Sequence, residues 1–186
     1  GDFGKGNDES FIDLIKELDR INEINRIRIS SIEPNLLTDE IIEFCNLSKK
    51  FMPHFHIPLQ SGSDKILKAM RRRYDKKVYQ NRIKKIKDTN QDTCIGVDVI
   101  VGFPGESDED FLETYNFLVD LDITYLHVFS YSERADTFAI KIDEKVSKID
   151  KAKRSKMLHI LSEKKKHSFY NNFINKKRPI LFEGLR

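Results

Sequence analysis

Small groups of polar residues follow four apolar segments of the sequence, and they could offer a ligand donors, acceptors and charge. They are Ser30, Ser31 and Glu33; Gln60, Ser61 and Ser63; Gly102 to Glu106; and Tyr131, Ser132 and Arg134. In parallel α/β folds, ligands bind past the carboxyl ends of the strands, because loops and helix N-termini there present free backbone N–H groups. A serine can equally cap a helix, and Glu33 can be an exposed loop acid. The four groups therefore indicate a site without identifying its ligand.

Asp98 stands out because it lies inside an apolar run, from Cys94 to Val101. An unpaired carboxylate is costly to bury there, so Asp98 needs a partner from the protein or from a ligand. The segment Gly102-Phe103-Pro104-Gly105 ends the run with a tight turn, through which a ligand can approach the backbone. Such a turn is weak evidence by itself.

Three histidines suggest a metal site at first. His54 and His56 share one face of a predicted strand, and His127 lies on another strand. No carboxylate stands at ligand spacing from them in the sequence, which favours polar packing over a metal site. Cys45 and Cys94 each lie in a pattern of buried helix or strand. They predict no disulfide framework, and two isolated cysteines cannot hold an iron–sulfur cluster alone.

Apolar segments alternate with amphipathic ones, which predicts strands alternating with helices. Strands are expected at residues 26–30, 54–59, 94–101 and 125–130, and a long helix at 147–174. Thr38 and Ser107 are expected to cap two of the other helices. Such βα units predict an α/β fold with a parallel sheet or barrel. Four strands leave an open edge near residues 26–30, through which we expect the chain to pair with a second copy.

Composition narrows the class of protein. Of 186 residues, 39% are hydrophobic and 34% are charged, and no apolar run approaches the ~20 residues that a membrane span requires. With few cysteines and no signal peptide pattern, this predicts a cytoplasmic protein without a membrane partner. The net charge is +3, but residues 148–178 hold eleven Lys or Arg against two acids, and Lys65 to Lys87 is also basic. Either stretch alone could be a solvated helix face, but together they favour a polyanionic partner.

Four motifs, in this order, resemble those of the radical S-adenosylmethionine (SAM) tRNA methylthiotransferases. They are Ile57 to Ser63, Met70 to Tyr74, Asp98 to Glu106, and Tyr131 to Thr137. His54-Phe55-His56 and the opening Gly1-Asp2-Phe3-Gly4 resemble the subgroup that modifies N6-threonylcarbamoyladenosine beside the anticodon. The resemblance implies that residues 1–175 form the C-terminal part of a partial (β/α)6 radical SAM barrel. It also implies that residues 176–186 begin a TRAM-like RNA-binding domain.

The resemblance also implies an activity. Enzymes of this family bind a 4Fe-4S cluster through a CxxxCxxC loop, and a radical derived from SAM abstracts hydrogen from C2 of an adenine. We therefore expect a methylthio group to be added to C2 of a modified adenosine next to the tRNA anticodon, with tRNA, SAM and a sulfur donor as partners. Because this sequence contains neither of the family's cysteine triads, the ligands of the 4Fe-4S clusters lie outside it. The chain by itself is expected to be inactive.

Five residues acquire SAM-binding roles through the resemblance. Glu33, with Ser31 nearby, matches a position that contacts the aminoacyl or ribose part of SAM. Gln60 and Arg72 match a related pair, in which Arg72 would face the SAM carboxylate, although either neighbouring arginine could take its place. Asp98 matches an acceptor of ribose hydroxyls, which would supply the partner that its burial requires.

Five further residues are expected around the nucleoside. Gly102, Phe103 and Pro104 would lie along the adenine, and Tyr131 would close the pocket or touch the substrate. Ser61 belongs to the same strand end as the Gln60 contact. No residue of this chain is assigned a catalytic or metal-binding role.

Two other functions stay open at this point. One is another radical SAM enzyme with similar residues at its strand ends, such as a relative of oxygen-independent coproporphyrinogen oxidase. The other is a non-enzymatic α/β module that binds a nucleotide through the Gly102 turn. The basic stretch at 148–178, which leads towards the expected RNA-binding domain, favours the methylthiotransferase.

Overall fold

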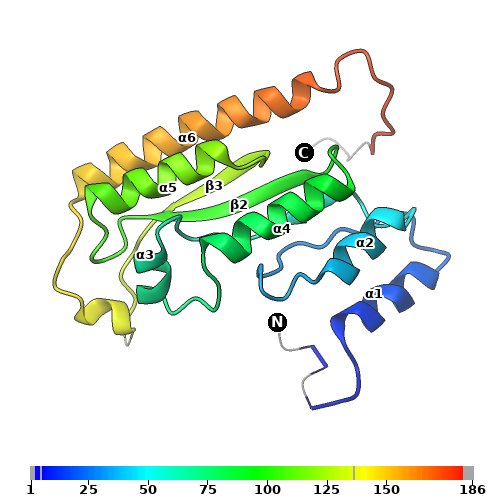
Figure 1. The fold of residues 1–186 in the computed structure, drawn as a ribbon, viewed down its shortest axis with the longest axis horizontal. Helices are drawn as coiled ribbons and strands as arrows, with labels where there is room; N and C mark the ends of the chain where they lie inside the picture. The colour runs from blue at the N-terminus through cyan, green and yellow to red at the C-terminus, as the bar shows by residue number, and fades with distance from the viewer. Residues whose placement is uncertain (1–2, 5, 136, 182–186) are drawn as a thin grey trace.

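The computed structural model describes residues 3–4, 6–135 and 137–181, and it has a parallel sheet at its centre (Figure 1). Strands β1 (His54–His56), β2 (Cys94–Val101) and β3 (Tyr125–Ser130) lie in the order β1-β2-β3, all parallel. The helices are α1 (Phe11–Arg20), α2 (Asp39–Leu47), α3 (Asp64–Ala69), α4 (Lys76–Thr89), α5 (Asp108–Asp120), the 3-10 helix η1 (Phe138–Lys141) and α6 (Lys148–Asn171). The predicted α/β class is confirmed.

Side-chain caps fix where several helices begin. The Thr38 hydroxyl accepts a hydrogen bond from the N–H of Ile41, which starts α2 as predicted. Ser107 and Asp110 form the predicted reciprocal capping box at the start of α5. These caps satisfy backbone N–H groups in the first turns of α2 and α5.

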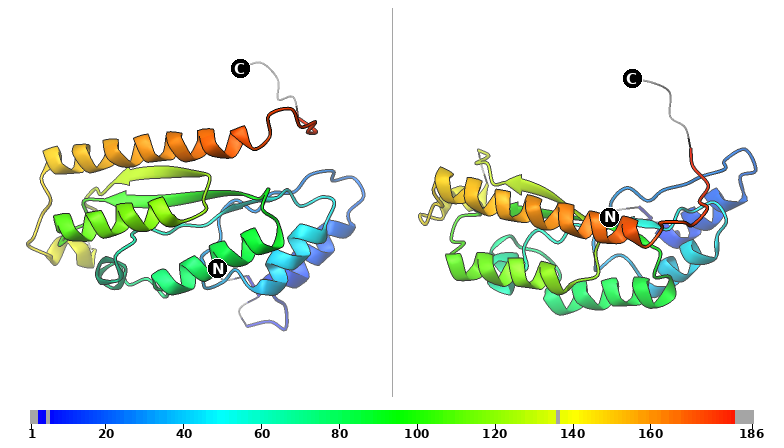
Figure 2. Two further views of the ribbon diagram at one scale, coloured as in Figure 1. Left: turned by 45° about the horizontal axis from the view of Figure 1, so that its top comes forward. Right: turned by 90° about the horizontal axis from the view of Figure 1, so that it is seen from above.

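The two faces of the sheet differ in how well they are covered. Along β2, the side chains of Ile95, Val97, Val99 and Val101 are buried, whereas those of Asp98 and Ile100 are only partly buried. Helices α4 and α5 lie over the buried face, and α6 runs beside β3 (Figure 2). A nearly continuous apolar run is expected of a parallel strand covered on both faces, but the face of β2 that carries Asp98 is only partly covered.

The first two predicted strands need correction. Residues 26–30 form no strand, and their only ladder contact is an isolated bridge from Ile27 to Phe51. The strand predicted at 54–59 ends at His56, although Gln60 bridges Val99 farther on. Hydrogen bonds to β2 nevertheless continue past His56, because the Ile57 N–H donates to Gly96 O and the Leu59 N–H donates to Asp98 O.

The segment after Ile27 still lies beside β1. The Ile27 N–H donates to Lys50 O, its carbonyl accepts from the Met52 N–H, and the Ile32 N–H donates to His56 O. This irregular segment therefore covers part of the edge through which pairing with a second copy is predicted. Self-association remains a prediction, with less free backbone at that edge than a regular strand would offer.

In the carboxyl-terminal part of the chain, the predicted long helix is confirmed, whereas the start of a TRAM-like domain is not tested. Helix α6 occupies most of the predicted range 147–174. Of the residues expected to begin a TRAM-like domain, 176–181 lie in no strand or helix, and 182–186 lie outside the described residues. The start of a TRAM-like domain therefore stays a prediction. Among the described residues, no helix is both long and apolar enough to cross a membrane.

Candidate functional site

A cavity of about 930 Å³ lies between the loop that follows residue 30 and the loop that follows α3. Ser31 and Glu33 line it from the first loop, and Arg72 lines it from the second. Three of the predicted contact residues therefore meet, although they are about forty positions apart in the sequence. The volume is within the range of about 300 to 1,000 Å³ that is usual for small-molecule sites.

The charged groups of this cavity leave hydrogen-bonding capacity unused. Arg72 Nη1 lies 3.6 Å from Glu33 Oε1, which is an ion pair but longer than a hydrogen bond. Arg72 Nε and the Oδ1 atom of Asn35, which also lines the cavity, are buried without a hydrogen-bond partner in the described structure. Buried polar atoms are rarely left in this state. A ligand with a carboxylate and an amino group, such as the amino-acid part of SAM, fits these donors and acceptors.

The backbone of Gln60 is hydrogen-bonded to the central strand β2. Its N–H donates to Asp98 O at 2.9 Å, its carbonyl accepts from the Ile100 N–H, and its φ angle is +70°. A non-glycine residue with positive φ is uncommon, and it is often found where function requires the backbone geometry. The structure thus places the Gln60 backbone beside that of Asp98.

The Ser61 hydroxyl is bonded within the protein. It is fully buried, lies 3.2 Å from the Thr114 hydroxyl of α5 and accepts from the Ser63 N–H. The hydroxyl therefore helps to attach this turn to α5, and the contact of Ser61 with a ligand stays a prediction.

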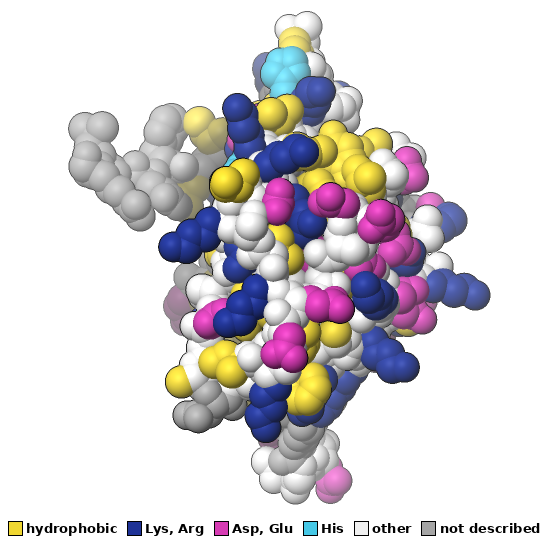
Figure 3. Space-filling model, turned by 90° about the vertical axis from the view of Figure 1, so that its left-hand side faces the viewer, with side chains coloured by type: hydrophobic (Ala, Val, Ile, Leu, Met, Phe, Trp, Pro, Cys, Tyr) yellow, Lys and Arg dark blue, Asp and Glu magenta, His cyan; other side chains and the backbone are white. Residues whose placement is uncertain are grey.

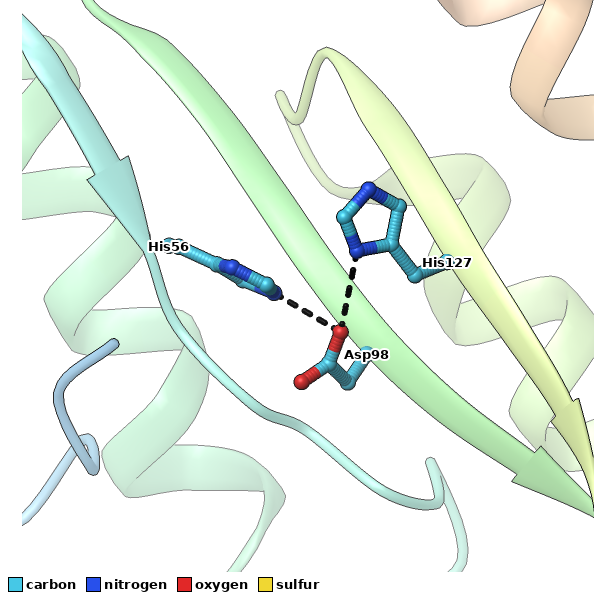
Figure 4. Close-up of side chains that lie close together, drawn as sticks. All are labelled: His56, Asp98 and His127. Atoms are coloured by element: carbon cyan, nitrogen blue, oxygen red, sulfur yellow. Dashed lines mark hydrogen bonds and ion pairs between the residues drawn. The ribbon is translucent and has the colours of Figure 1, made fainter. Parts of the chain in front are cut away.

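Asp98 contacts histidines from both neighbouring strands (Figure 4). Its Oδ1 lies 2.7 Å from His56 Nε2 and 3.3 Å from His127 Nδ1. His127 is the direct cross-strand neighbour of Asp98, whereas His56 is paired with Gly96 and approaches diagonally. The side chains of His56, Asp98 and His127 are 14%, 18% and 49% exposed. The partner that Asp98 requires thus comes from the protein, and the cluster is most open at His127.

These three residues could also be considered as a metal site, because their ligand atoms all lie within 4.8 Å of one another. The prediction that no carboxylate would stand near the histidines is therefore wrong. The grouping differs too, since His54 instead meets the Tyr125 hydroxyl at 3.0 Å. Neighbouring ligands of a tetrahedral zinc ion lie roughly 3.3 Å apart. The 2.7 Å between His56 and Asp98 is shorter, so it fits a direct hydrogen bond better.

The Gly102 turn is held by a buried ion pair that the sequence motifs did not reveal. Gly102 has φ +74°, and its N–H donates to Glu106 Oε2 at 2.6 Å. Arg154 of α6 binds the same carboxylate at 2.6 Å and Asp108 at 2.8 Å. The Glu106 and Arg154 side chains are only 1% and 7% exposed. Burial raises the pKa of Glu106, although the Gly102 N–H and Arg154 stabilise its charged form.

Phe103 and Tyr131, both expected near the adenine, also meet. Their rings lie edge to face with centroids 5.3 Å apart. Lys151 of α6 donates to the Tyr131 carbonyl and places its ammonium 5.3 Å from the centre of the Tyr131 ring. Pro104 is buried in the same turn. The turn after β2 and the end of β3 therefore form one packed unit.

The basic residues of 148–178 prove to be divided between structural and surface roles. Arg154 is buried, Lys165 donates to the carbonyls of Val119 and Leu121, and Arg178 pairs with Asp92. The end of the molecule seen in Figure 3 shows basic and acidic side chains interspersed. The count of charges in the sequence therefore overstates how much free positive surface this stretch offers.

Neither cysteine is prepared to bind metal. Burial raises the pKa of Cys45 to about 12, and it also raises the pKa of Cys94. Metal ligation needs the thiolate, which is disfavoured at both positions near neutral pH. This agrees with the expectation that cluster ligands are not contributed by this chain.

Comparisons with known proteins agree with the geometry. The family model for the radical SAM superfamily matches residues 3–118. The threonylcarbamoyladenosine tRNA methylthiotransferase of Bacillus subtilis is 41% identical over 95% of this chain and 39% of its own length. The tRNA-2-methylthio-N6-dimethylallyladenosine synthase of Syntrophus aciditrophicus is 39% identical over 94% of this chain and 38% of its own. The chain thus spans about two fifths of these curated relatives.

Two solved structures share the fold. Coproporphyrinogen III oxidase from Escherichia coli, a radical SAM enzyme, aligns with a TM-score of 0.60 and 16% identity over 87% of this chain and 36% of its own. A radical SAM methyltransferase from Kitasatospora setae aligns with a TM-score of 0.53 and 15% identity over 63% of this chain and 22% of its own. The predicted partial radical SAM barrel is confirmed. The chain therefore belongs to the radical SAM superfamily, and its relatives within that superfamily are tRNA methylthiotransferases.

Proposed function

We propose that this chain forms the SAM-binding part of an enzyme that adds a methylthio group to C2 of a modified adenosine next to the tRNA anticodon. The observation that carries the proposal is the cavity lined by Glu33, Asn35 and Arg72, in which Asn35 Oδ1 and Arg72 Nε are buried without a hydrogen-bond partner among the described residues. The 41% identity to a threonylcarbamoyladenosine tRNA methylthiotransferase indicates N6-threonylcarbamoyladenosine as the modified base. We further propose tRNA and a sulfur donor as partners, and the cytoplasm as the compartment.

In this proposal, different residues of the site contact different parts of the SAM molecule. Arg72 offers its guanidinium to the carboxylate, because a planar fork suits two oxygens. Glu33 accepts from the amino group, and Gln60 and Asp98 meet the ribose. The buried turn of Gly102 to Pro104, with Tyr131 against it, excludes water from the adenine. Bound SAM supplies hydrogen abstraction after reductive cleavage at a 4Fe-4S cluster, whose ligands this chain does not provide.

A coproporphyrinogen oxidase-like activity is the second candidate, since that enzyme shares the fold. Identity of 16% supports a common fold but no common substrate, whereas the tRNA-modifying relatives reach 41%. A non-enzymatic nucleotide-binding module is less well supported than either enzyme, because the relatives of this chain are enzymes. We therefore retain the methylthiotransferase as the proposal.

The test is SAM binding to the 186-residue chain, measured by isothermal titration calorimetry. Replacing Arg72→Ala is expected to weaken binding roughly 10- to 100-fold, which is the usual effect of losing a charged hydrogen bond. Arg26→Ala is the matched control and should change affinity less than about twofold, since Arg26 is exposed and does not line the cavity. A chain that does not bind SAM, or a stronger effect at Arg26, would contradict the assignment.

The expected inactivity of the chain alone has its own measurement. After incubation with iron and sulfide under reducing conditions, we expect no iron–sulfur absorbance and no cleavage of SAM. The physical reason is that Cys45 and Cys94 are the only thiols, and burial disfavours the thiolate of each. Appearance of either signal would disprove this part of the proposal.

A further inference from the structure

We propose that His56 and His127 are positioning residues that hold one oxygen of Asp98 in place, so that its other oxygen faces the ribose hydroxyls. The inference rests on the proposed SAM site, and it assigns a role to two histidines that no SAM contact requires directly. It explains why two ring nitrogens from two strands converge on Asp98 Oδ1 (Figure 4).

The two carboxylate oxygens of Asp98 are used unequally. Oδ1 lies within 2.7 Å of His56 and 3.3 Å of His127, whereas Oδ2 has no hydrogen-bond partner in the described part of the chain. Oδ2 is also absent from the buried atoms that lack a partner, so it is accessible to solvent or a ligand. A carboxylate with one oxygen fixed and the other free is suited to accept hydrogen bonds from a diol.

A purely structural pair would not need this arrangement. Asp98 lies on the less covered face of the sheet, where one histidine would already satisfy a partly exposed carboxylate. Instead, His127 is held between two aromatic neighbours, with its ring 5.0 Å from that of His56 and 5.1 Å from that of Tyr125. Tyr125 is in turn hydrogen-bonded to His54. This row of rings restricts rotation of the imidazole that contacts Asp98.

The geometry also specifies where the His56 proton lies. An ionised carboxylate only accepts hydrogen bonds, so His56 donates from Nε2, whereas His127 Nδ1 approaches at the distance of an ion pair. A neutral His56 therefore carries its proton on Nε2. This tautomer is a direct signature of the arrangement, and it does not depend on any substitution.

The decisive experiment compares two ligands in a set of variants. Binding of S-adenosylhomocysteine and of an analogue without the two ribose hydroxyls is measured for the 186-residue chain and for His56→Ala, His127→Ala and Asp98→Ala. We expect each histidine variant to bind S-adenosylhomocysteine roughly tenfold more weakly. The analogue should bind each of them as it binds the parent. In the Asp98→Ala background, removing either histidine should cause no further loss.

Controls separate positioning from a loss of fold. His159→Ala, at an exposed position on α6, should leave both affinities unchanged. His56→Gln keeps an amide donor and should recover part of the lost affinity. Ring ¹⁵N spectra of the parent should show an Nε2-protonated His56. The opposite tautomer at His56 would overturn the inference even if a variant failed to fold.

The outcomes also distinguish this inference from the proposed function. If the parent binds S-adenosylhomocysteine and the histidine variants bind it equally well, the positioning role is wrong and the SAM site stands. If the variants lose affinity for both ligands alike, the histidines do not act through the ribose. If the parent binds neither ligand, the SAM site and the positioning role are both wrong.

Discussion

Two pairs of oppositely charged residues, Glu106 with Arg154 of α6 and Glu33 with Arg72, differ in how fully their hydrogen-bonding groups are satisfied. Glu106 and Arg154 are almost fully buried, 2.6 Å apart, and further bonded to the Gly102 N–H and to Asp108. Glu33 and Arg72 are half-buried, 3.6 Å apart, and border a cavity in which Arg72 Nε has no partner among the described residues. The first pair can hold a turn, whereas the second retains capacity for a ligand.

The number of satisfied hydrogen-bonding groups in a charged pair indicates whether the pair stabilises the fold or binds a ligand, even when no ligand is bound. A buried pair contributes to a fold only when its remaining hydrogen-bonding groups are satisfied, because desolvation otherwise exceeds the attraction. The Glu106–Arg154 pair nearly meets that condition, with Arg154 Nε as the exception. The Glu33–Arg72 pair is more exposed and keeps unused donors, which is expected of a site prepared for another charged group.

The largest effect on the free energy of unfolding is expected at the buried Glu106–Arg154 pair. Arg154→Met leaves the Glu106 carboxylate buried without its cation, so the free energy of unfolding should fall by about 3 to 5 kcal/mol. Urea denaturation followed by circular dichroism measures this change. Adding Glu106→Gln to Arg154→Met should recover part of the loss. The matched change at the open pair, Arg72→Met, should cost less than about 1 kcal/mol; equal losses at the two pairs would remove the distinction.

A smaller effect on stability, which depends on pH, is expected from His54. Its buried Nδ1 also lacks a hydrogen-bond partner in the described structure. Burial, with the charges of Arg28 and His56, lowers the pKa of His54 to about 4 from 6.5. Between these values the unfolded chain binds the proton and the folded chain does not. The stability contributed by neutral His54 is therefore present above pH 6.5 and lost as the pH falls towards 4, by roughly 3 kcal/mol at most.

Denaturation between pH 4 and 7 tests this dependence. His54→Phe keeps a ring but cannot titrate, so its stability should vary less over this range than that of the parent. His159→Phe, at an exposed position, is the control and should retain the parental slope. Identical slopes for the parent and His54→Phe would show that His54 does not stay neutral in the fold.

The sequence predicted β2 and β3 better than the first two strands. Strands 94–101 and 125–130 were correct at both ends. The first is an apolar run rich in β-branched residues, and the second pairs with it in register along its whole length. Residues 26–30 alternate between polar and β-branched side chains but form only one bridge. A strand needs a ladder partner along its length, and the sequence of the strand does not show whether one exists.

The residues of the site were also only partly predictable from the sequence. Glu33 and Arg72 could be placed together only through the resemblance, because they come from separate loops. The roles of Arg154 and of the two histidines around Asp98 were missed for a different reason. Arg154 was hidden in a basic stretch, and the Asp98 contacts depend on strand register, which pairs Asp98 with His127. Register is a tertiary property, and one position of slip would turn these side chains to opposite faces.

The smallest effect on stability, and the sharpest separation of stability from binding, is expected at Asn35. Its Oδ1 borders the cavity and makes no hydrogen bond within the described chain, so Asn35→Ala removes no stabilising contact. The free energy of unfolding should change by less than about 0.5 kcal/mol. SAM affinity should nevertheless fall roughly fivefold, because a neutral hydrogen bond to the ligand is lost. Asn46→Ala, at an exposed position on α2, serves as the control. If Asn35→Ala instead destabilised the fold and left SAM affinity unchanged, this side of the cavity would be structural, and the contrast with the buried Arg154 pair would no longer hold.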